Sequence, residues 1–329
     1  MHHIKLFLVL GLLLCGSAWA QSDCSPFNPE NTKIVDRGPV KTVSGPLADF
    51  DPCHKSVRLD TPSFFAKKRG DKPPLVIIAH GGGGLGGYER EFAKLMNQQG
   101  FATLIFDAFE MNELTPFSDL LLYYMSNGGR QRMIYKATLG AYQWALKIEK
   151  IDASKIFIQG LSNGAAVAIN MAGAVDAVNV RGVIAEGGPS AGIGFPDDIK
   201  VPLLLIYGAA DNYGGVQQDD WMHLRGMPCS YNENSRLAPV GFTQTCNRLA
   251  NPTEPMPSPQ KWYEGTKAKG HDIRLELIDG GGHGMMFADF TSSSRQLAGG
   301  RMFYRSQGAS ADTRQKLQRL IFEFIESRL

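Results

Sequence analysis

A serine at a predicted strand-to-helix turn is the residue of this sequence best suited to act as a nucleophile. Ser162 lies within Gly160–Gly164, which reads Gly-Leu-Ser-Asn-Gly; the apolar run 155–159 precedes it and an alanine-rich segment follows. A sharp strand–serine–helix turn strains the serine backbone and needs small residues two positions before and after it, where Gly160 and Gly164 stand. The context therefore predicts a nucleophile elbow, although the pentapeptide alone would also fit a surface turn.

A serine hydroxyl needs a base near neutral pH, usually a histidine oriented by a carboxylate. His283 is the one histidine that lies just after a predicted strand inside a mobile-looking loop, the glycine-rich segment 279–284. This loop follows the last predicted strand, which is where the chain order serine, acid, histidine places the base. We predict that His283 is the general base.

Three carboxylates could orient His283. Asp211 follows a buried strand and a turn of small residues, and we predict that it is the acid. Glu186, at the end of another apolar strand, is the second candidate. Asp279 is nearer in sequence but is expected to cap its strand.

The tetrahedral intermediate of acyl transfer needs backbone N–H donors aimed at its oxyanion. Asn163 follows the nucleophile directly and should supply one. The second should come from Gly81 or Gly82, in the glycine run that follows the strand 74–79.

The same glycine run also fits a dinucleotide-binding fingerprint. Gly82, Gly84 and Gly87 have the required spacing, and Asp107 lies where a ribose-binding acid would be expected. Against this, the strand concerned is not the first of the domain and the chain is expected to be exported. A nicotinamide site would also leave the serine, acid and histidine without a purpose.

Strand-like and helix-like segments alternate from about residue 55 and predict an α/β fold, a mostly parallel twisted sheet with helices on both faces. Continuous apolar runs, as in strands buried on both faces, occur at 74–79, 102–106, 155–159, 182–185, 202–207 and 274–278. Residues 55–59 alternate and predict an antiparallel edge strand. Apolar stripes at helical spacing lie within 88–96, 134–148 and 317–324.

The N-terminal 20 residues have the pattern of a secretory signal: a basic start, the apolar run 6–14 and Ala18-Trp19-Ala20 as a cleavage site. We expect a secreted or periplasmic mature chain that begins at Gln21 and forms one domain, 21–329. Residues 212–262 interrupt the α/β pattern and predict a cap-like insertion before the last strand.

Four cysteines follow the signal segment, and an even number in an exported chain predicts two disulfides. Neighbours in sequence favour the pairs Cys24–Cys53 and Cys229–Cys246, the second of which would staple the insertion. Four cysteines allow three pairings, and a metal site is the alternative. The absence of Cys-x-x-Cys and of paired histidine spacing argues against metal.

Scattered basic residues and a formal net charge of +2 give no sign of a nucleic-acid surface, and no later segment has the length of a membrane helix. No cofactor is expected, and the oligomeric state is left open. Tyr213, Trp221, Tyr231 and Trp262 could line an acyl pocket or form the insertion's own core.

Over residues 55–329 the chain resembles the dienelactone-hydrolase-like branch of the α/β-hydrolase fold. Four motifs carry the resemblance: His80 to Gly83, Gly160 to Gly164, Gly208 to Asp211, and Gly282 to Gly284. The elbow is also similar to that of secreted polyester depolymerases and feruloyl-type esterases. The resemblance implies an exported serine esterase acting on a small or polymeric ester. A peptidase or acyltransferase on the same triad, and a binding protein without turnover, remain the alternatives.

Overall fold

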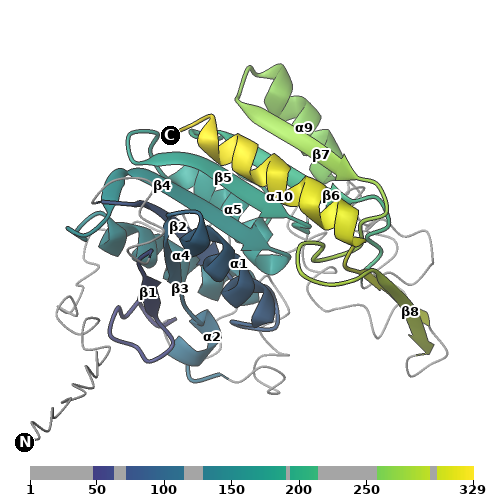
Figure 1. The fold of residues 1–329 in the computed structure, drawn as a ribbon, viewed down its shortest axis with the longest axis horizontal. Helices are drawn as coiled ribbons and strands as arrows, with labels where there is room; N and C mark the ends of the chain where they lie inside the picture. Colours follow the sequence, from purple (N-terminus) through teal and green to yellow (C-terminus); the bar gives the residue numbers. More distant parts are fainter. Residues whose placement is uncertain (1–46, 63–71, 115–128, 190–192, 214–257, 297–301) are drawn as a thin grey trace, which may run out of the picture.

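The computed structural model describes residues 47–62, 72–114, 129–189, 193–213, 258–296 and 302–329 (Figure 1). The predicted signal segment, most of the predicted insertion, and Cys24, Cys229 and Cys246 lie outside these residues. Cys53 is described and lies exposed at the surface. Both disulfides therefore stay predictions.

A seven-stranded sheet forms the centre of the described structure, in the order β1-β3-β2-β4-β5-β6-β7. The strands are β1 (Arg58–Asp60), β2 (Pro74–Ala79), β3 (Ala102–Ile105), β4 (Asp152–Leu161), β5 (Val180–Glu186), β6 (Leu203–Gly208) and β7 (Ile273–Ile278). Only the edge strand β1 runs antiparallel to its neighbour. The predicted parallel sheet with one antiparallel edge strand is confirmed.

Helices cover both faces of this sheet (Figure 1). One face carries α1 (Gly87–Gln98) and α10 (Ala311–Glu326), which pack on alternate strand residues such as Ile78 and Ile206. The other carries α4 (Gly129–Ala145) and α5 (Asn163–Ala174), packed on residues such as Ile77 and Leu205. Because both faces are buried, β2 and β6 are apolar throughout, as their sequences predicted.

Two shorter helices complete the parallel part of the fold. Helix α2 (Ala108–Met111) follows β3, and α9 (Pro259–Ala268) precedes β7. Ser258 caps α9 by accepting a hydrogen bond from the Lys261 N–H, and Pro259 occupies its first turn. The predicted insertion therefore ends in the first turn of α9. In the described part of the chain, no helix is both long and apolar enough to cross a membrane.

A β-hairpin between β7 and α10 was not predicted. It consists of β8 (Thr291–Gln296) and β9 (Met302–Gln307), which pair antiparallel and extend away from the sheet (Figure 1). Every residue of β8 is exposed. The strand therefore lacks the apolar periodicity on which a sequence prediction depends.

The parallel strands all present their carboxyl ends at one edge of the sheet. The loops that begin there contain every predicted catalytic residue, since β2, β4, β6 and β7 precede Gly81, Ser162, Asp211 and His283. Ligands in open α/β sheets bind at this edge. The fold thus brings together residues that are far apart in the sequence.

Candidate active site

Ser162 has the strained backbone that the elbow prediction requires. Its φ is 58° and its ψ is −119°, between the end of β4 and the start of α5. A Cβ on Gly160 would lie 2.0 Å from the Gly164 carbonyl oxygen, and one on Gly164 would lie 2.1 Å from the Ala79 carbonyl oxygen. Only glycine fits at either position, so the turn is a tight strand–serine–helix elbow packed against the end of β2.

His283 is paired with Asp211. The His283 Nδ1 lies 2.9 Å from the Asp211 Oδ2, and the two residues are 6% and 3% exposed. Asp211 follows β6 and His283 follows β7, two adjacent parallel strands whose carboxyl ends meet. Of the three carboxylates considered, Asp211 is the one that holds the imidazole, whereas Asp279 lies exposed beyond β7.

The surroundings of His283 raise its pKa. Burial by itself lowers the pKa, but the charge and the hydrogen bond of Asp211 outweigh burial, with a smaller contribution from Glu186. The guanidinium of Arg305 opposes them. The net direction makes His283 a stronger base than an ordinary histidine.

An aromatic ring covers the imidazole. Tyr213 stacks on His283 with ring centroids 4.7 Å apart and an interplanar angle of 25°. Arg305 of β9 lies 5.4 Å from the centroid of the Tyr213 ring. The Tyr213 N–H also donates to the Asp211 Oδ1 at 3.1 Å, so Tyr213 contacts both members of the pair.

The serine segment and the histidine segment lie against each other. The Ser162 N–H donates to the main-chain oxygen of Glu186 at 2.9 Å. A Cβ on Gly187 would lie 3.1 Å from the His283 ring, and one on Gly284 would lie 3.7 Å from the Leu161 side chain. The ends of β4 and β5 therefore adjoin the histidine loop.

The unpredicted hairpin anchors this loop. The His283 N–H donates to the Ser306 carbonyl at 2.8 Å, and the His283 carbonyl accepts from the Gly308 N–H at 2.9 Å. The Gly282 N–H donates to the Gly308 carbonyl at 2.9 Å. Main-chain pairing with β9 and the residue after it thus fixes the position of His283, which the sequence had suggested to be a mobile loop residue.

The glycine run after β2 is held by a buried carboxylate. The Gly81 N–H donates to Glu89 Oε1 at 3.0 Å, and the Gly86 N–H donates to Glu89 Oε2 at 2.9 Å. Since the Gly81 amide is already bonded, Gly82 is the remaining candidate for an oxyanion donor from this loop. A Cβ on Gly82 would lie 2.5 Å from the Asn163 Nδ2, which places Gly82 beside the elbow.

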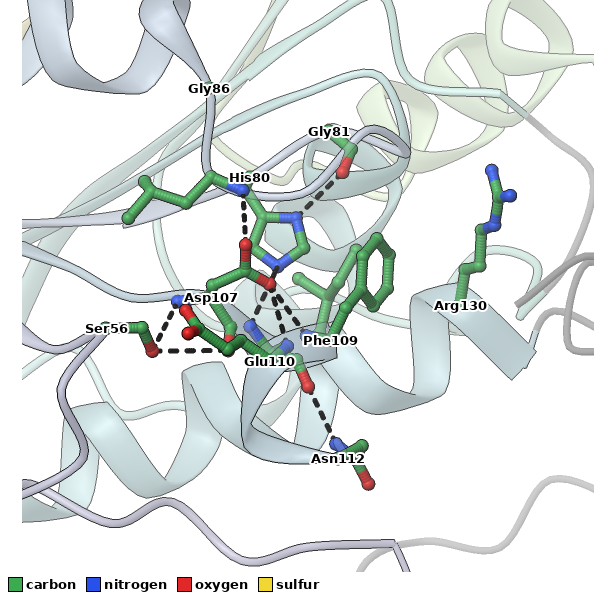
Figure 2. Close-up of polar contacts among 12 residues, drawn as sticks. Ser56, His80, Gly81, Gly86, Asp107, Phe109, Glu110, Asn112 and Arg130 are labelled. Atoms are coloured by element: carbon green, nitrogen blue, oxygen red, sulfur yellow. Dashed lines mark hydrogen bonds and ion pairs between the residues drawn. The ribbon is translucent and has the colours of Figure 1, made fainter. Parts of the chain in front are cut away.

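His80 fixes the start of the same loop from below (Figure 2). Its Nε2 accepts a hydrogen bond from the Ala108 N–H at 3.0 Å, so its Nδ1 carries the proton and donates to the Gly81 carbonyl at 2.7 Å. The ring is fully buried, and the Asp107 Oδ1 lies 3.8 Å from its Nε2.

Asp107 ties the glycine run to α2 (Figure 2). Its Oδ1 caps the helix by accepting from the N–H groups of Phe109 and Glu110, and its Oδ2 accepts from the Leu85 N–H at 3.0 Å. Asp107 and Glu89 together accept hydrogen bonds from the main-chain N–H groups of this loop, which a bound pyrophosphate would need as donors. This arrangement argues against the dinucleotide hypothesis, because both the donors and the charge are unsuitable.

Asn163 is the first residue of α5. Main-chain N–H groups in the first turn of a helix have no partner within the helix and point along the positive end of its dipole. The Asn163 side chain is held by Gln131, whose Nε2 donates to the Asn163 Oδ1 at 2.9 Å. Arg130, the neighbour of Gln131 on α4, donates from Nη1 to the Gly82 carbonyl at 3.1 Å, which connects α4 to both candidate oxyanion donors.

The aromatic residues considered for an acyl pocket are divided by the structure. Tyr213 lies at the site, over His283. Trp262 lies elsewhere: it stacks on Phe195 at 4.8 Å and donates from Nε1 to the Pro196 carbonyl at 3.0 Å. Trp221 and Tyr231 lie outside the described residues. Within the described ranges no cluster of three histidine, cysteine or acidic side chains is arranged to hold a metal ion.

The elbow after β4, and Asp211 and His283 after β6 and β7, follow the order serine, acid, histidine that is typical of the α/β-hydrolase fold. No protein-family model matches the chain, and a search of curated proteins found no match.

Solved structures of similar fold were found. Pyrococcus horikoshii acylaminoacyl peptidase is 17% identical with a TM-score of 0.49, and the match covers 83% of this chain and 39% of that one. A dienelactone hydrolase-like promiscuous phosphotriesterase from metagenomic libraries is 12% identical with a TM-score of 0.47, covering 83% and 99%. Dienelactone hydrolase from Anabaena variabilis is 18% identical with a TM-score of 0.38, covering 69% and 81%. At these identities and TM-scores, the similarities give no information on the activity of this chain.

Proposed function

We propose that this protein is a serine hydrolase that cleaves carboxylic esters through an acyl-enzyme intermediate. The observation that carries the proposal is the buried Asp211–His283 hydrogen bond, with Ser162 held in a strained elbow at the same edge of the sheet. A nucleophile, a base and an acid at the carboxyl edge of the sheet are the groups that acyl transfer requires. A binding protein without turnover does not require them.

In the first half-reaction the Ser162 oxygen attacks the ester carbonyl carbon while His283 takes the hydroxyl proton on Nε2. Asp211 keeps the imidazole oriented through Nδ1–H and stabilises the imidazolium that forms. The new carbon–oxygen bond to Ser162 replaces the bond to the leaving alcohol, and His283 returns the proton to the departing alkoxide. Water then repeats the sequence in place of the serine and releases the acid.

The oxyanion of the tetrahedral intermediate is assigned to the main-chain N–H groups of Asn163 and Gly82. Loss of one such donor typically costs about 3 kcal/mol of transition-state stabilisation. Gly81 is given a different role, because Glu89 already accepts its N–H. It lines the site without binding the oxyanion.

We also propose that the protein works outside the cytoplasm. The support is the signal-like segment 1–20 and the even number of cysteines after it. The pairs Cys24–Cys53 and Cys229–Cys246 and the cap-like role of 212–262 belong to the same proposal.

Labelling with a fluorophosphonate tests the nucleophile. We expect one covalent adduct, on the Ser162 peptide in mass spectrometry, and hydrolysis of a short p-nitrophenyl ester that fails in Ser162→Ala. Asp211→Asn should reduce kcat by about 10⁴-fold because the imidazole is left in the wrong tautomer.

Two results would contradict the proposed ester hydrolysis by Ser162. Undiminished ester hydrolysis in Ser162→Ala, or an adduct on another residue, would overturn the proposal. Paired ester and amide substrates with one acyl group, with and without added acceptor alcohol, separate an esterase from a peptidase or acyltransferase. Failure to react with any activated ester would favour a binding protein.

A further inference from the structure

Glu186 is a buried carboxylate beside the proposed triad that the reaction above does not use. It ends β5, is 1% exposed, and lies opposite Leu161 in the pairing of β4 with β5. An ionised carboxylate in such a place costs stability unless hydrogen bonds satisfy it. Its contacts therefore indicate what it does.

The main chain and the side chain of Glu186 hold different parts of the site. Its carbonyl oxygen accepts from the Ser162 N–H at 2.9 Å. Its Oε1 accepts from the N–H of Met285, two residues after His283, at 2.6 Å. A single residue thus connects the nucleophile segment to the base segment.

Helix α1 supplies the second donor. The Tyr88 hydroxyl donates to the Glu186 Oε2, and the Tyr88 ring packs edge-on against Phe287 with centroids 5.3 Å apart. Phe287 belongs to the same loop as His283. Tyr88 therefore contacts the loop directly and also through the carboxylate.

The charge of Glu186 also acts on His283. The charged groups that face the imidazole are Asp211 after β6, Glu186 at the end of β5, and Arg305 on β9, with the neutral Tyr213 ring stacked over it. Both carboxylates favour the imidazolium and Arg305 disfavours it. The pKa of Glu186 itself is raised, chiefly by burial and also by the charge of Asp211, although Tyr88, the Met285 N–H and His283 act in the opposite direction.

We propose that Glu186 is a positioning residue of the triad: it fixes the serine segment against the histidine segment, and its negative charge supports the imidazolium formed during acyl transfer. The inference rests on the proposed ester hydrolysis. It assigns no contact between Glu186 and the substrate.

Three variants separate charge from geometry. Glu186→Gln keeps an oxygen for the Met285 N–H but removes the charge. Glu186→Asp keeps the charge but shortens the reach to Met285. Tyr88→Phe removes a donor and leaves the carboxylate in place. Glu91→Gln, an exposed position on α1, is the matched control for removing a glutamate charge.

The decisive measurement is kcat/KM against pH, because its acid limb reports the pKa of the base in the free enzyme. Activity requires neutral His283, and loss of the Glu186 charge lowers the pKa of His283. We therefore expect the acid limb of Glu186→Gln to move to lower pH, by up to about one unit, with up to about tenfold lower kcat at the plateau.

Glu186→Asp should keep the wild-type acid limb and lose only kcat, and Tyr88→Phe should also lower kcat. A purely structural residue would change kcat or stability in all three variants and leave the acid limb of Glu186→Gln in place, which would overturn the electrostatic half of the inference. Wild-type kcat together with a wild-type limb in Glu186→Gln would overturn both halves.

Failure of the inference can be told apart from failure of the proposed function. If the wild-type protein is not labelled at Ser162 by fluorophosphonate, the function itself is wrong. If Glu186→Gln does not fold, Glu186→Asp and Tyr88→Phe still test the geometry: unchanged kcat in both, with wild-type thermal stability, contradicts it.

Discussion

At the scale of single residues, the site depends on positions where a side chain cannot be accommodated. Gly187 has a φ of 63°, and its missing Cβ would lie 3.1 Å from the His283 ring and 3.4 Å from the Asp211 Oδ2. Left-handed backbone of this kind favours glycine. Gly187 thus allows the end of β5 to approach the acid–base pair closely.

Gly187→Ala is expected to lower kcat/KM by roughly 10- to 100-fold, because the added methyl group displaces the imidazole from its position. Gly270→Ala is the matched control: its φ is 87°, but nothing lies within 4 Å of the added Cβ. Both variants should lose about 1–2 kcal/mol of unfolding free energy from backbone strain. Ester-hydrolysis kinetics and thermal unfolding of the pair measure this, and equal activity in the two would contradict the close approach.

At the scale of elements, the loop after β2 is positioned by α1 and α2. Glu89 on α1 bonds two of its amides, and Asp107 at the start of α2 bonds a third. His80 adds a bond from its ring to the Gly81 carbonyl. The backbone of loop glycines is conformationally free by itself. These contacts from neighbouring helices therefore set the direction of the Gly82 amide.

Glu89→Gln should therefore loosen the loop, since an amide side chain offers one acceptor oxygen where two are needed. A buried N–H left unpaired costs about 1–3 kcal/mol, which chemical denaturation would measure. We expect kcat to fall together with stability. Glu91→Gln, two residues along and exposed, should leave both unchanged. A stable Glu89→Gln variant with full activity would show that the loop needs no such support.

At the scale of the whole molecule, the order of the parallel strands brings the residues of the proposed active site together. Adjacent strands β6 and β7 are followed by Asp211 and His283, and β4 and β2 are followed by the proposed nucleophile and the proposed oxyanion loop. The β8–β9 hairpin then fixes the histidine through main-chain hydrogen bonds. His283 is thus held both by Asp211 after β6 and by the main chain of the hairpin.

The proposed export has consequences for the whole chain. Expressed with its N-terminal segment in a host that secretes, the protein should be recovered from the periplasm or medium with Gln21 at its N-terminus. Non-reducing peptide mapping should find Cys24–Cys53 and Cys229–Cys246, and each bond should contribute about 3 kcal/mol of stability. An uncleaved N-terminus, or four thiols that react with alkylating agent in the unfolded protein, would contradict this.

The elements and the strand–serine–helix turn at Ser162 were predictable because their signals are local. Continuous apolar runs indicated the parallel strands, and the glycines around Ser162 indicated the elbow. The histidine and its acid followed from their places after strands. The β8–β9 hairpin was missed because β8 is polar and exposed, and a hairpin without a buried face leaves no pattern in the sequence.

The sequence by itself thus determined the α/β class and the short set of residues able to perform acyl transfer. It left three acids open for His283 and two glycines open for the oxyanion. Tertiary structure alone decided between them, because the choice depends on which groups already have hydrogen-bond partners. Glu89 bonds Gly81, and Tyr88 and Met285 bond Glu186, while Asp211 holds the imidazole. Partners so distant along the chain meet only when the sheet has formed.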